Sequence, residues 1–211
     1  GMAGGEFGVR GFIDAYHPDT GELAWRTYTI PGEGEFGNDT WSGDSWKTGG
    51  SATWITGAYA ADQNLIYWGT GNPGPDWNGD VRLGDNLYSD SALALNGDTG
   101  EIEWYFQFTP HDVHDWDAIQ VPILADLNID GQDQRVMMWA NRKAFFDSSN
   151  AADGKFLKGS PFATQTWAQG LDANGAPVRV PGMEPTYEGI MVSPPITGGT
   201  NWYSPGYPSP I

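Results

Sequence analysis

The sequence predicts an all-β fold, and three features of its composition and patterning support this prediction. Thirty Gly and fifteen Pro in 211 residues are too many for long helices. Eleven Trp, nine Tyr and nine Phe supply the large, flat side chains that are enriched in strands. Short apolar runs such as "NLIYWGTG" (64–71) and "QRVMMWAN" (134–141) read as strands, and no amphipathic helix exceeds two turns.

The first strands belong to a hairpin that occurs more than once. Residues 15–25 ("AYHPDTGELAW") and 94–104 ("ALNGDTGEIEW") share the pattern Ala-x-x-x-Asp-Thr-Gly-Glu-x-x-Trp, in which Asp starts a tight turn and Gly supplies a positive φ. A weaker third copy, "AADGKFL" (151–157), has Phe156 or Leu157 in place of the Trp. Recurring hairpins with a periodic Gly and aromatic residue predict the blades of a β-propeller, each covering the face of the next.

One further segment could be misread as a metal site. "DLNIDG" (126–131) matches the opening of a calcium-binding EF-hand loop, but Met137 stands at the twelfth position, where that loop needs Glu. No helices are predicted on either side. We therefore expect a polar hairpin turn that leads into the strand at 134–141.

Charge and composition limit the classes of partner. The formal net charge is −17, and ten Lys and Arg cannot form the cationic stripe that neutralises phosphates, so we expect no nucleic-acid binding. The charge suits a cation-binding or simply a very soluble protein. No apolar run reaches the ~20 residues of a membrane span. The opening "GMAGGEFGVRG" lacks an export signal, so we expect a cytosolic protein or an internal piece of a longer one, and the Pro-rich end favours the second.

Five segments carry a more specific signal, in this order along the chain: "GGEFGVRGFIDAY", "GDSWKTGGSATW", "NLIYWGTGNPGPDWNGDVRLGDNLY", "HDWDAIQVPILAD" and "GGTNWYSP". Together they resemble the pyrroloquinoline quinone (PQQ)-dependent alcohol dehydrogenases, the quinoproteins that include methanol and ethanol dehydrogenases. The resemblance implies an eight-bladed β-propeller formed by a much longer chain. Residues 1–211 would then be roughly the middle third of a single PQQ-binding propeller domain, with no internal domain boundary. The family's upstream pair of adjacent cysteines has no counterpart here.

The resemblance implies a set of metal ligands. Glu6 matches the family's metal-ligating Glu, and Asn72 matches the residue that offers an amide oxygen to the metal; hard oxygen donors suit a hard cation. By itself, Glu6 reads as the exposed acid of a turn. Asn72 precedes Pro73, and by itself this Asn-Pro pair reads as a turn.

The acidic stretch "TPHDVHDWDAIQ" (109–120) could be a metal site, an acid–base site or a solvated loop. Asp115 and Asp117 are two positions apart, so in an extended strand their side chains would point to the same face. Under the resemblance, Asp115 matches the catalytic Asp, which lies near the metal and takes the hydroxyl proton of the substrate. Asp117 matches an extra acid that distinguishes lanthanide-using members from many that use Ca²⁺, since a trivalent ion gains more from an added anionic oxygen than a divalent ion does. His114 is not expected to be catalytic.

The resemblance also implies contacts to PQQ. A Gly pair lets the backbone approach a flat ligand, a Trp forms the floor under the ring, and an Arg hydrogen-bonds near the quinone carbonyls. The matching residues are Gly4, Gly5, Trp54, Arg142, Asn201 and Trp202, of which the last two contact the far edge of the cofactor. Without the resemblance, Trp54 would count as one core Trp among eleven. After Arg142 the sequence departs from the family, which leaves open the placement of Lys143 and of the next strand.

The implied activity is oxidation of an alcohol to an aldehyde or ketone. A Ca²⁺ or lanthanide ion polarises PQQ, Asp115 removes the proton, and electrons pass to a cytochrome c in the periplasm. Two alternatives stay open: a non-catalytic propeller scaffold, and a quinoprotein for sugars or polymer alcohols. A scaffold would have no reason to keep the matched residues together. We predict that the side-chain oxygens of Glu6, Asn72, Asp115 and Asp117 meet at the propeller axis, at the same end as Trp54 and Asn201.

Overall fold

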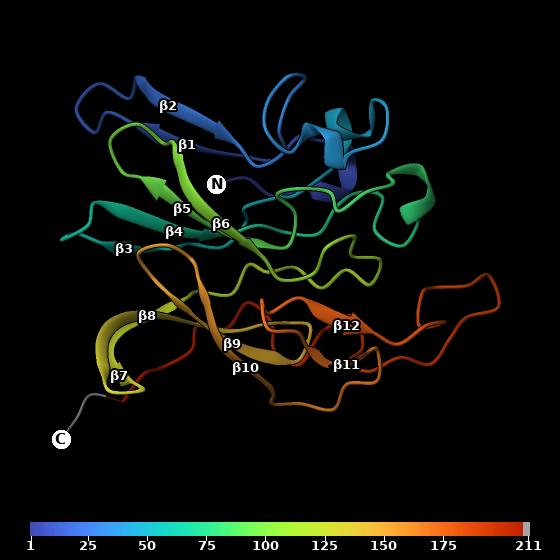
Figure 1. Ribbon diagram of the computed structural model, residues 1–211. Helices are drawn as coiled ribbons and strands as arrows, with labels where there is room; N and C mark the ends of the chain where they lie inside the picture. Colours follow the sequence, from blue (N-terminus) through green and yellow to red (C-terminus); the bar gives the residue numbers. More distant parts are fainter. Residues whose placement is uncertain (209–211) are drawn as a thin grey trace.

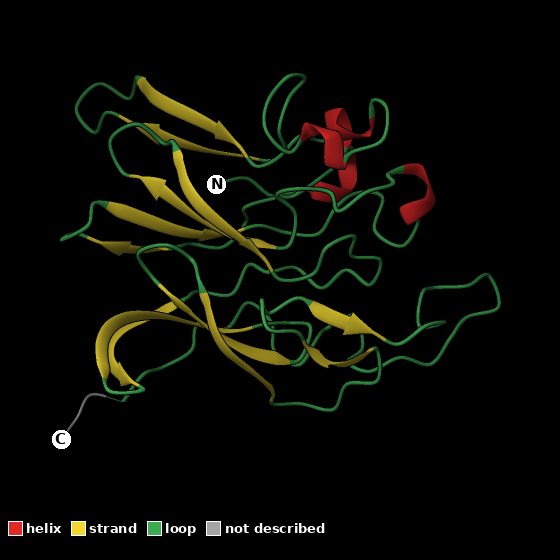
Figure 2. Ribbon diagram, in the orientation of Figure 1, coloured by secondary structure: helices red, strands yellow, loops and turns green. Residues whose placement is uncertain are grey.

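The computed structural model describes residues 1–208 and is all-β, as predicted (Figure 1). The strands are β1 (Phe12–Tyr16), β2 (Leu23–Tyr28), β3 (Ala58–Ala60), β4 (Leu65–Gly69), β5 (Ser91–Asn96), β6 (Ile102–Gln107), β7 (Ile123–Ile129), β8 (Gln132–Ala140), β9 (Phe145–Asn150), β10 (Phe156–Pro161), β11 (Ala168–Leu171) and β12 (Pro177–Arg179). The helical turns are short 3-10 segments: η1 (Gly5–Phe7), η2 (Asn38–Thr40), η3 (Ser45–Thr48) and η4 (Gly79–Val81). Figure 2 shows these turns in red, on the opposite side from the hairpin turns of the sheets.

Consecutive strands pair antiparallel, which is the meander expected of propeller blades. The sheets run β1-β2, then β3-β4-β5-β6, then β7-β8-β9-β10, and finally β11-β12. Two complete four-stranded blades are thus flanked by two-stranded sheets on either side. This arrangement confirms the prediction of a partial β-propeller.

The turns predicted from the repeats lie where expected. The segment 15–25 forms the turn between β1 and β2, and 94–104 forms the turn between β5 and β6. The weaker copy at 151–157 joins β9 to β10. Residues 126–129 are the end of β7, and Asp130 and Gly131 form the tight turn into β8, so this segment is a β-hairpin, as predicted, and not a helix-flanked EF-hand loop.

The repeated Trp and Gly pack against each other across neighbouring sheets. Gly100 has φ +74, and a Cβ there would overlap the indole of Trp25 in the preceding sheet. Gly154 has φ +71, and a Cβ there would overlap the indole of Trp104 in the preceding sheet. The ring of Phe156 packs on Gly175 of the next sheet in the same manner. In the third copy of the repeat, Phe156 rather than Leu157 therefore occupies the position of the Trp. Glycine is required at these turns for both its φ and its missing side chain.

Strand β5 shows how sequence alternation fills the space between blades. Its small residues Ala92 and Ala94 face a cluster that contains Tyr67, Trp104 and Trp139, while Leu93 and Leu95 face the opposite cluster. Both faces of the strand are buried, since successive side chains point to opposite sides.

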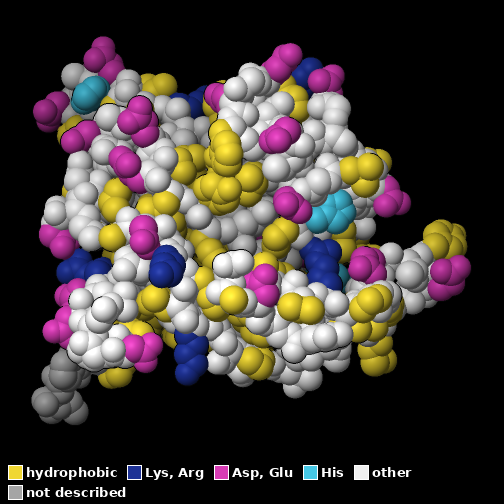
Figure 3. Space-filling model, viewed as in Figure 1, with side chains coloured by type: hydrophobic (Ala, Val, Ile, Leu, Met, Phe, Trp, Pro, Cys, Tyr) yellow, Lys and Arg dark blue, Asp and Glu magenta, His cyan; other side chains and the backbone are white. Residues whose placement is uncertain are grey.

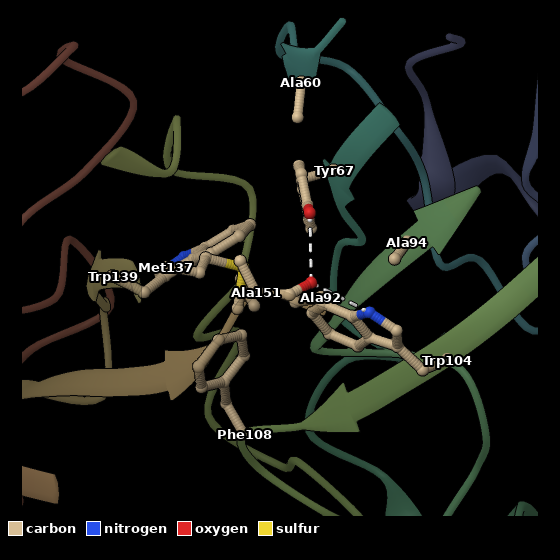
Figure 4. Close-up of a cluster of buried hydrophobic side chains, with 10 residues drawn as sticks. Ala60, Tyr67, Ala92, Ala94, Trp104, Phe108, Met137, Trp139 and Ala151 are labelled. Atoms are coloured by element: carbon tan, nitrogen blue, oxygen red, sulfur yellow. Dashed lines mark hydrogen bonds between the residues drawn. The ribbon is translucent and has the colours of Figure 1, made fainter. Parts of the chain in front are cut away.

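Figure 4 shows the first of these clusters, which joins the two four-stranded blades. The carbonyl of Ala151 accepts hydrogen bonds from Tyr67 Oη (3.0 Å) and Trp104 Nε1 (3.1 Å). Each of these two large aromatic side chains therefore keeps its polar atom satisfied inside the core.

The surface reflects the acidic composition. In the view of Figure 3, Asp and Glu side chains are spread over the face, and Lys and Arg are few. Within residues 1–208, no helix has the length and apolar character that a membrane crossing requires.

Candidate metal and cofactor site

Three loops that carry predicted site residues are joined by backbone hydrogen bonds around Gly50. Gly50 donates to Val9 O and accepts from Gly11 N, both at 2.9 Å, and so lies beside the loop of Glu6. Ser51 N donates to Asn72 O (2.9 Å) on the other side. Gly50 has φ +77, and a Cβ there would lie 3.1 Å from Asn72 O. The Gly pair of "KTGGS" thus lets the first and third loops approach each other.

Asp117 connects Asn72 to Arg142. Its Oδ1 accepts the backbone N–H of Asn72 at 2.8 Å, and its Oδ2 pairs with Arg142 Nη1. All three residues are buried. They come from the loop after β4, the segment before β7 and the turn between β8 and β9, so the fold brings together residues far apart in sequence.

Asp115 lies beside the same guanidinium. Its Oδ2 is 3.7 Å from Arg142 Nη2, and its backbone has φ +61. Asp115 and Asp117 do not lie in an extended strand, because Asp115 adopts the left-handed conformation, so the same-face geometry of a strand does not apply to them. The two carboxylates instead converge on Arg142 from a turn.

Burial and the repulsion between neighbouring carboxylates raise the pKa values of the acids at this site. The pKa of Asp115 is raised to about 8, first by burial and then by the charge of Asp117, against the opposing effect of Arg142. Burial raises the pKa of Asp117 to about 6, with Arg142 and the Asn72 N–H opposing. Burial also raises the pKa of Asp76. Burial is the largest cause for all three groups, and a cation bound beside them would favour their charged forms.

Glu6 lies on η1, between two glycines in the left-handed conformation, Gly4 (φ +86) and Gly8 (φ +69). Its carboxylate is exposed, and it lies near enough to Asp117 and Asp76 to raise their pKa values. The adjacent Gly5 is buried, and its carbonyl oxygen lies close to the loop that carries the Gly pair of "KTGGS". Glu6 is therefore a neighbour of the carboxylate cluster.

Trp54 lies half-buried in the loop before β3, on the central segment that joins the other two loops. The preceding Thr53 donates its backbone N–H to Met2 O at 2.9 Å, and Met2 N donates to Thr53 Oγ1 at 3.0 Å. The predicted aromatic floor is thus tied to the N-terminal segment that carries Gly4 and Gly5.

The C-terminal segment reaches the site through its glycines rather than through Asn201 and Trp202. Gly199 N donates to Arg142 O at 2.9 Å, and Gly198 packs directly on the Arg142 side chain. Asn201 Nδ2 bonds within its own segment, to Thr197 O at 3.0 Å, and Trp202 stacks on its neighbour Tyr203.

The donor set has the chemistry that a hard cation requires. In residues 1–208 no three His, Asp or Glu side chains are arranged as a ready metal cage. However, the Nδ2 of Asn72 donates to Asp76 Oδ1 at 2.8 Å, which turns the amide so that Oδ1 is available as an acceptor. Carboxylates of Asp115 and Asp117, the Asn72 oxygen and the nearby Glu6 are all oxygen donors, and they fit Ca²⁺ or a lanthanide.

Sequence reasoning missed two acids that shape this site. Asp76 fixes the amide of Asn72, and Asp112 accepts backbone N–H groups on both sides of Asp115. Asp112 stands in the acidic stretch itself, three residues before Asp115, and an Asp followed by a turn is a known acceptor for such N–H groups. Asp76 had no comparable local signal.

An apolar cavity of about 260 Å³ borders the Asp115 loop. Its lining includes Trp77, His114, Trp116, Ile190, Val192 and Ile196. The His114 ring stacks on Trp116 at 4.2 Å, and its Nε2 lies in hydrogen-bond contact with Met183 O (2.8 Å). His114 therefore forms part of the cavity wall.

Comparison with known proteins identifies the family. Residues 4–159 match the family described as glucose/ethanol/alcohol dehydrogenase, beta-propeller domain. The quinoprotein alcohol dehydrogenase PedH of Pseudomonas putida is 43% identical over 98% of this chain and 39% of its own length. A lanthanide-dependent methanol dehydrogenase of Methylorubrum extorquens is 37% identical over 82% of this chain and 32% of its own.

Solved structures give the same result. A europium-containing methanol dehydrogenase superposes with a TM-score of 0.90 at 31% identity, over 96% of this chain and 39% of that one. The quinohemoprotein alcohol dehydrogenase of Comamonas testosteroni gives 0.86 at 36% identity, over 95% and 32%. The chain thus spans about two fifths or less of the length of these relatives. It belongs to the PQQ-dependent, or quinoprotein, alcohol dehydrogenase family and folds as part of that family's β-propeller domain.

Proposed function

We propose that residues 1–211 supply the metal-binding and proton-accepting part of a PQQ-dependent alcohol dehydrogenase. The observation that carries the proposal is the meeting of Asn72, Asp115, Asp117 and Arg142, which come from separate loops of the propeller. The similarity to quinoprotein alcohol dehydrogenases supports it. The whole range 1–211 would belong to one propeller domain without an internal boundary.

In this proposal Asp115 is the general base. Its carboxylate would accept the hydroxyl proton of the alcohol, while bound PQQ, polarised by a metal ion, would supply the acceptor for the hydride. Arg142 would orient the cofactor, and its buried Nε, which lacks a hydrogen-bond partner among residues 1–208, leaves one donor free for a quinone oxygen. Trp54 would stack under the ring, beside the backbone of Gly4 and Gly5.

Asn201 and Trp202 would contact the far edge of the cofactor. Their own contacts in this structure are local, so this assignment rests on the sequence match, together with the packing of the adjacent glycines on Arg142. Binding of the cofactor would draw this segment toward the ring.

We propose a lanthanide as the preferred metal. Glu6, Asp115 and Asp117 provide three carboxylates, and Asn72 adds a neutral oxygen, so the ligand charge balances a trivalent ion. Two relatives that are named as lanthanide-dependent support this choice. Metal binding would require Asp117 to exchange or share the contact that it makes with Arg142.

The substrate would be an alcohol whose carbon chain lies in the apolar cavity beside Trp116. A cytochrome c would accept the electrons, and the reaction would take place in the periplasm; both follow from the family resemblance. Several relatives are named as quinohemoproteins, which fits electron transfer to haem.

The test uses the protein of family length that contains residues 1–211, loaded with PQQ and a light lanthanide. We expect dye-linked oxidation of alcohols with formation of the aldehyde. Asp115→Asn should lower kcat by about 10²–10⁴-fold, the usual contribution of a general base, with little change in KM.

Asp130→Asn is the matched control, because Asp130 is also an Asp with positive φ (+53) but lies in the exposed turn between β7 and β8. It should retain wild-type kcat. A wild-type protein that binds PQQ but oxidises no alcohol would contradict the proposal, as would full activity in Asp115→Asn.

A further inference from the structure

Arg82 is a fully buried arginine whose guanidinium bonds to neutral groups. It is 0% exposed, and within residues 1–208 its guanidinium donates to backbone carbonyls and to an amide oxygen. A buried charge needs its donors satisfied, because each unpaired donor loses its hydration without compensation. Its bonding partners therefore show what holds it in place.

The guanidinium bridges two loops of the candidate site. Nε donates to Pro75 O (3.2 Å), and Nη2 donates to Asp76 O (2.9 Å); both carbonyls belong to the loop that begins at Asn72. Nη2 also donates to Asp112 O at 2.5 Å, in the loop that carries Asp115. The planar fork of Arg suits such a bridge, because its donors point in fixed directions.

Asn86 holds Arg82 from the other side. Arg82 Nη1 donates to Asn86 Oδ1 at 2.8 Å, and Asn86 Nδ2 returns a hydrogen bond to Arg82 O at 2.7 Å. Asn86 is also fully buried. The side chain of Arg82 is therefore fixed in one orientation by reciprocal bonds within its own turn.

Asp112 continues the connection from Arg82 to Asp115. Its carboxylate is buried, and it accepts the N–H of His114 at Oδ1 (3.0 Å) and the N–H of Trp116 at Oδ2 (2.7 Å). These two N–H groups flank Asp115. They fix the turn in which Asp115 has φ +61, a conformation that a non-glycine residue seldom adopts without support.

Charge supports the same arrangement. The carboxylates of Asp112, Asp90 and Asp76 all lie near enough to Arg82 to favour its charged form against burial, which lowers its pKa. None of these three carboxylates hydrogen-bonds to the guanidinium, so its donors remain committed to the carbonyls of the two loops and to Asn86. Electrostatics stabilises the cation, and the hydrogen bonds determine its position.

We propose that Arg82 and Asp112 are positioning residues, which fix the distance between the Asn72 loop and the Asp115 turn and so hold the proposed metal ligand and the proposed base in register. This inference rests on the proposed function for the roles of Asn72 and Asp115. Neither Arg82 nor Asp112 would touch the substrate or the cofactor. Both act through the backbone of the loops that they join.

The decisive variant is Asp112→Asn. The Oδ1 of the Asn can accept one of the two N–H groups. Its NH₂ group would face the other N–H, and because both are donors, that hydrogen bond is lost. The turn around Asp115 should then open while Arg82 keeps its place. A displacement of about 1 Å can cost about a hundredfold in rate, so we expect kcat to fall about a hundredfold and KM to change less than about threefold.

A second readout does not depend on turnover. Europium luminescence lifetimes in H₂O and D₂O count the water molecules on the bound ion in the full-length protein, with and without PQQ. Loss of the Asp115 oxygen from the ion would add roughly one water molecule in Asp112→Asn. Arg82→Lys, which keeps the charge but loses the fork, should give the same increase.

Asp172→Asn is the matched control. Asp172, like Asp112, accepts the N–H groups of residues two and four positions later, Asn174 (2.8 Å) and Ala176 (2.9 Å), but it accepts both on Oδ1, which an Asn retains. It lies between β11 and β12, away from the site, so its variant should keep both the hydration number and kcat.

The outcomes separate the two proposals. An inactive wild-type protein that binds europium, with added hydration in Asp112→Asn, would refute the proposed dehydrogenase activity but support the positioning role. An active wild-type protein with unchanged hydration and unchanged kcat in Asp112→Asn would refute the positioning role. Lower thermal stability with unchanged hydration would assign Asp112 and Arg82 to structure alone and would also overturn the inference, as would failure of the wild type to bind europium.

Discussion

Lys143 and Asp147 form a buried ion pair whose energetics can be predicted from the structure. Lys143 Nζ lies 3.2 Å from Asp147 Oδ2, and the two side chains are 0% and 1% exposed. Nζ also donates to Phe108 O and to Asp147 Oδ1, each at 3.3 Å. The pair lies directly after Arg142, in the segment where the sequence departs from the family. Its contribution to stability therefore shows whether this segment is held in place by charge pairing.

The expected effect of breaking the pair follows from its burial. Two unit charges 3.2 Å apart attract by about 5 kcal/mol at an effective dielectric constant of about 20. Removing one partner leaves the other charge buried and unpaired, which costs about 3–5 kcal/mol. Lys143→Met and Asp147→Leu should each destabilise the protein by this amount. The double variant should lie within about 1 kcal/mol of wild type, because apolar residues of similar shape replace a buried pair with little loss.

The assay is a double-mutant cycle on urea unfolding of the protein of family length, followed by Trp fluorescence. The expected coupling free energy is about 5 kcal/mol or more, because two single losses of about 3–5 kcal/mol each shrink to about 1 kcal/mol in the double variant; this exceeds the range of about 0.5–3 kcal/mol that is usual for contacting residues. The control cycle uses Arg135 and Asp126, whose Nε–Oδ1 distance is only 2.6 Å but which lie at the surface. Solvent screens that pair, so its coupling should be far smaller.

Two results would refute the reasoning. The first is single variants that cost less than about 1 kcal/mol each, which would mean that water reaches the pair. The second is a double variant as unstable as the sum of the single variants, which would mean that packing rather than charge pairing dominates the site.

Three further predictions address the metal, the blade contacts and pH. Asp117→Ala should reverse the proposed lanthanide preference and weaken lanthanide binding at least about tenfold, measured by metal titration and by activity with Ca²⁺; an unchanged preference would mean that Asp117 is not a ligand. Gly154→Ala places a Cβ 2.5 Å from Trp104 Cε3 at φ +71, so it should cost about 2–5 kcal/mol in urea unfolding. Gly131→Ala, at φ +83 with open space, should cost only the backbone part, about 1–2 kcal/mol, and equal losses would contradict the packing argument. Burial lowers the pKa of His111 below 6.5, so the unfolded state binds more protons at this residue as pH falls through 6.5, and the contribution of His111 to stability is lost there; the stability of wild type relative to the His111→Asn variant, which tolerates φ +50, should therefore fall between pH 7 and 5, while the raised pKa values of Asp115 and Asp117 act in the opposite direction in both proteins.

The local structure of the chain could be predicted from short stretches of sequence. The Asp-Thr-Gly-Glu turns, the strands at 64–71 and 134–141 and the hairpin at 126–131 all lie where the pattern placed them. Turn chemistry and the alternation of a strand act over about ten residues, so a single segment contains the information. The order of the motifs also sufficed to identify the family.

The partners of the site residues were decided by the tertiary structure. Sequence could name Asp115, Asp117 and Arg142, but not that Arg142 lies between the two carboxylates, nor that Asp115 has a left-handed backbone. Arg82 offered no local signal at all, because its role depends on carbonyls 6 to 30 residues away. The choice of Phe156 over Leu157 likewise depended on where Gly175 of the next sheet lies. The burial and the partners of these residues depend on segments that are distant in the sequence, and no short stretch of the chain contains both sides of the contact.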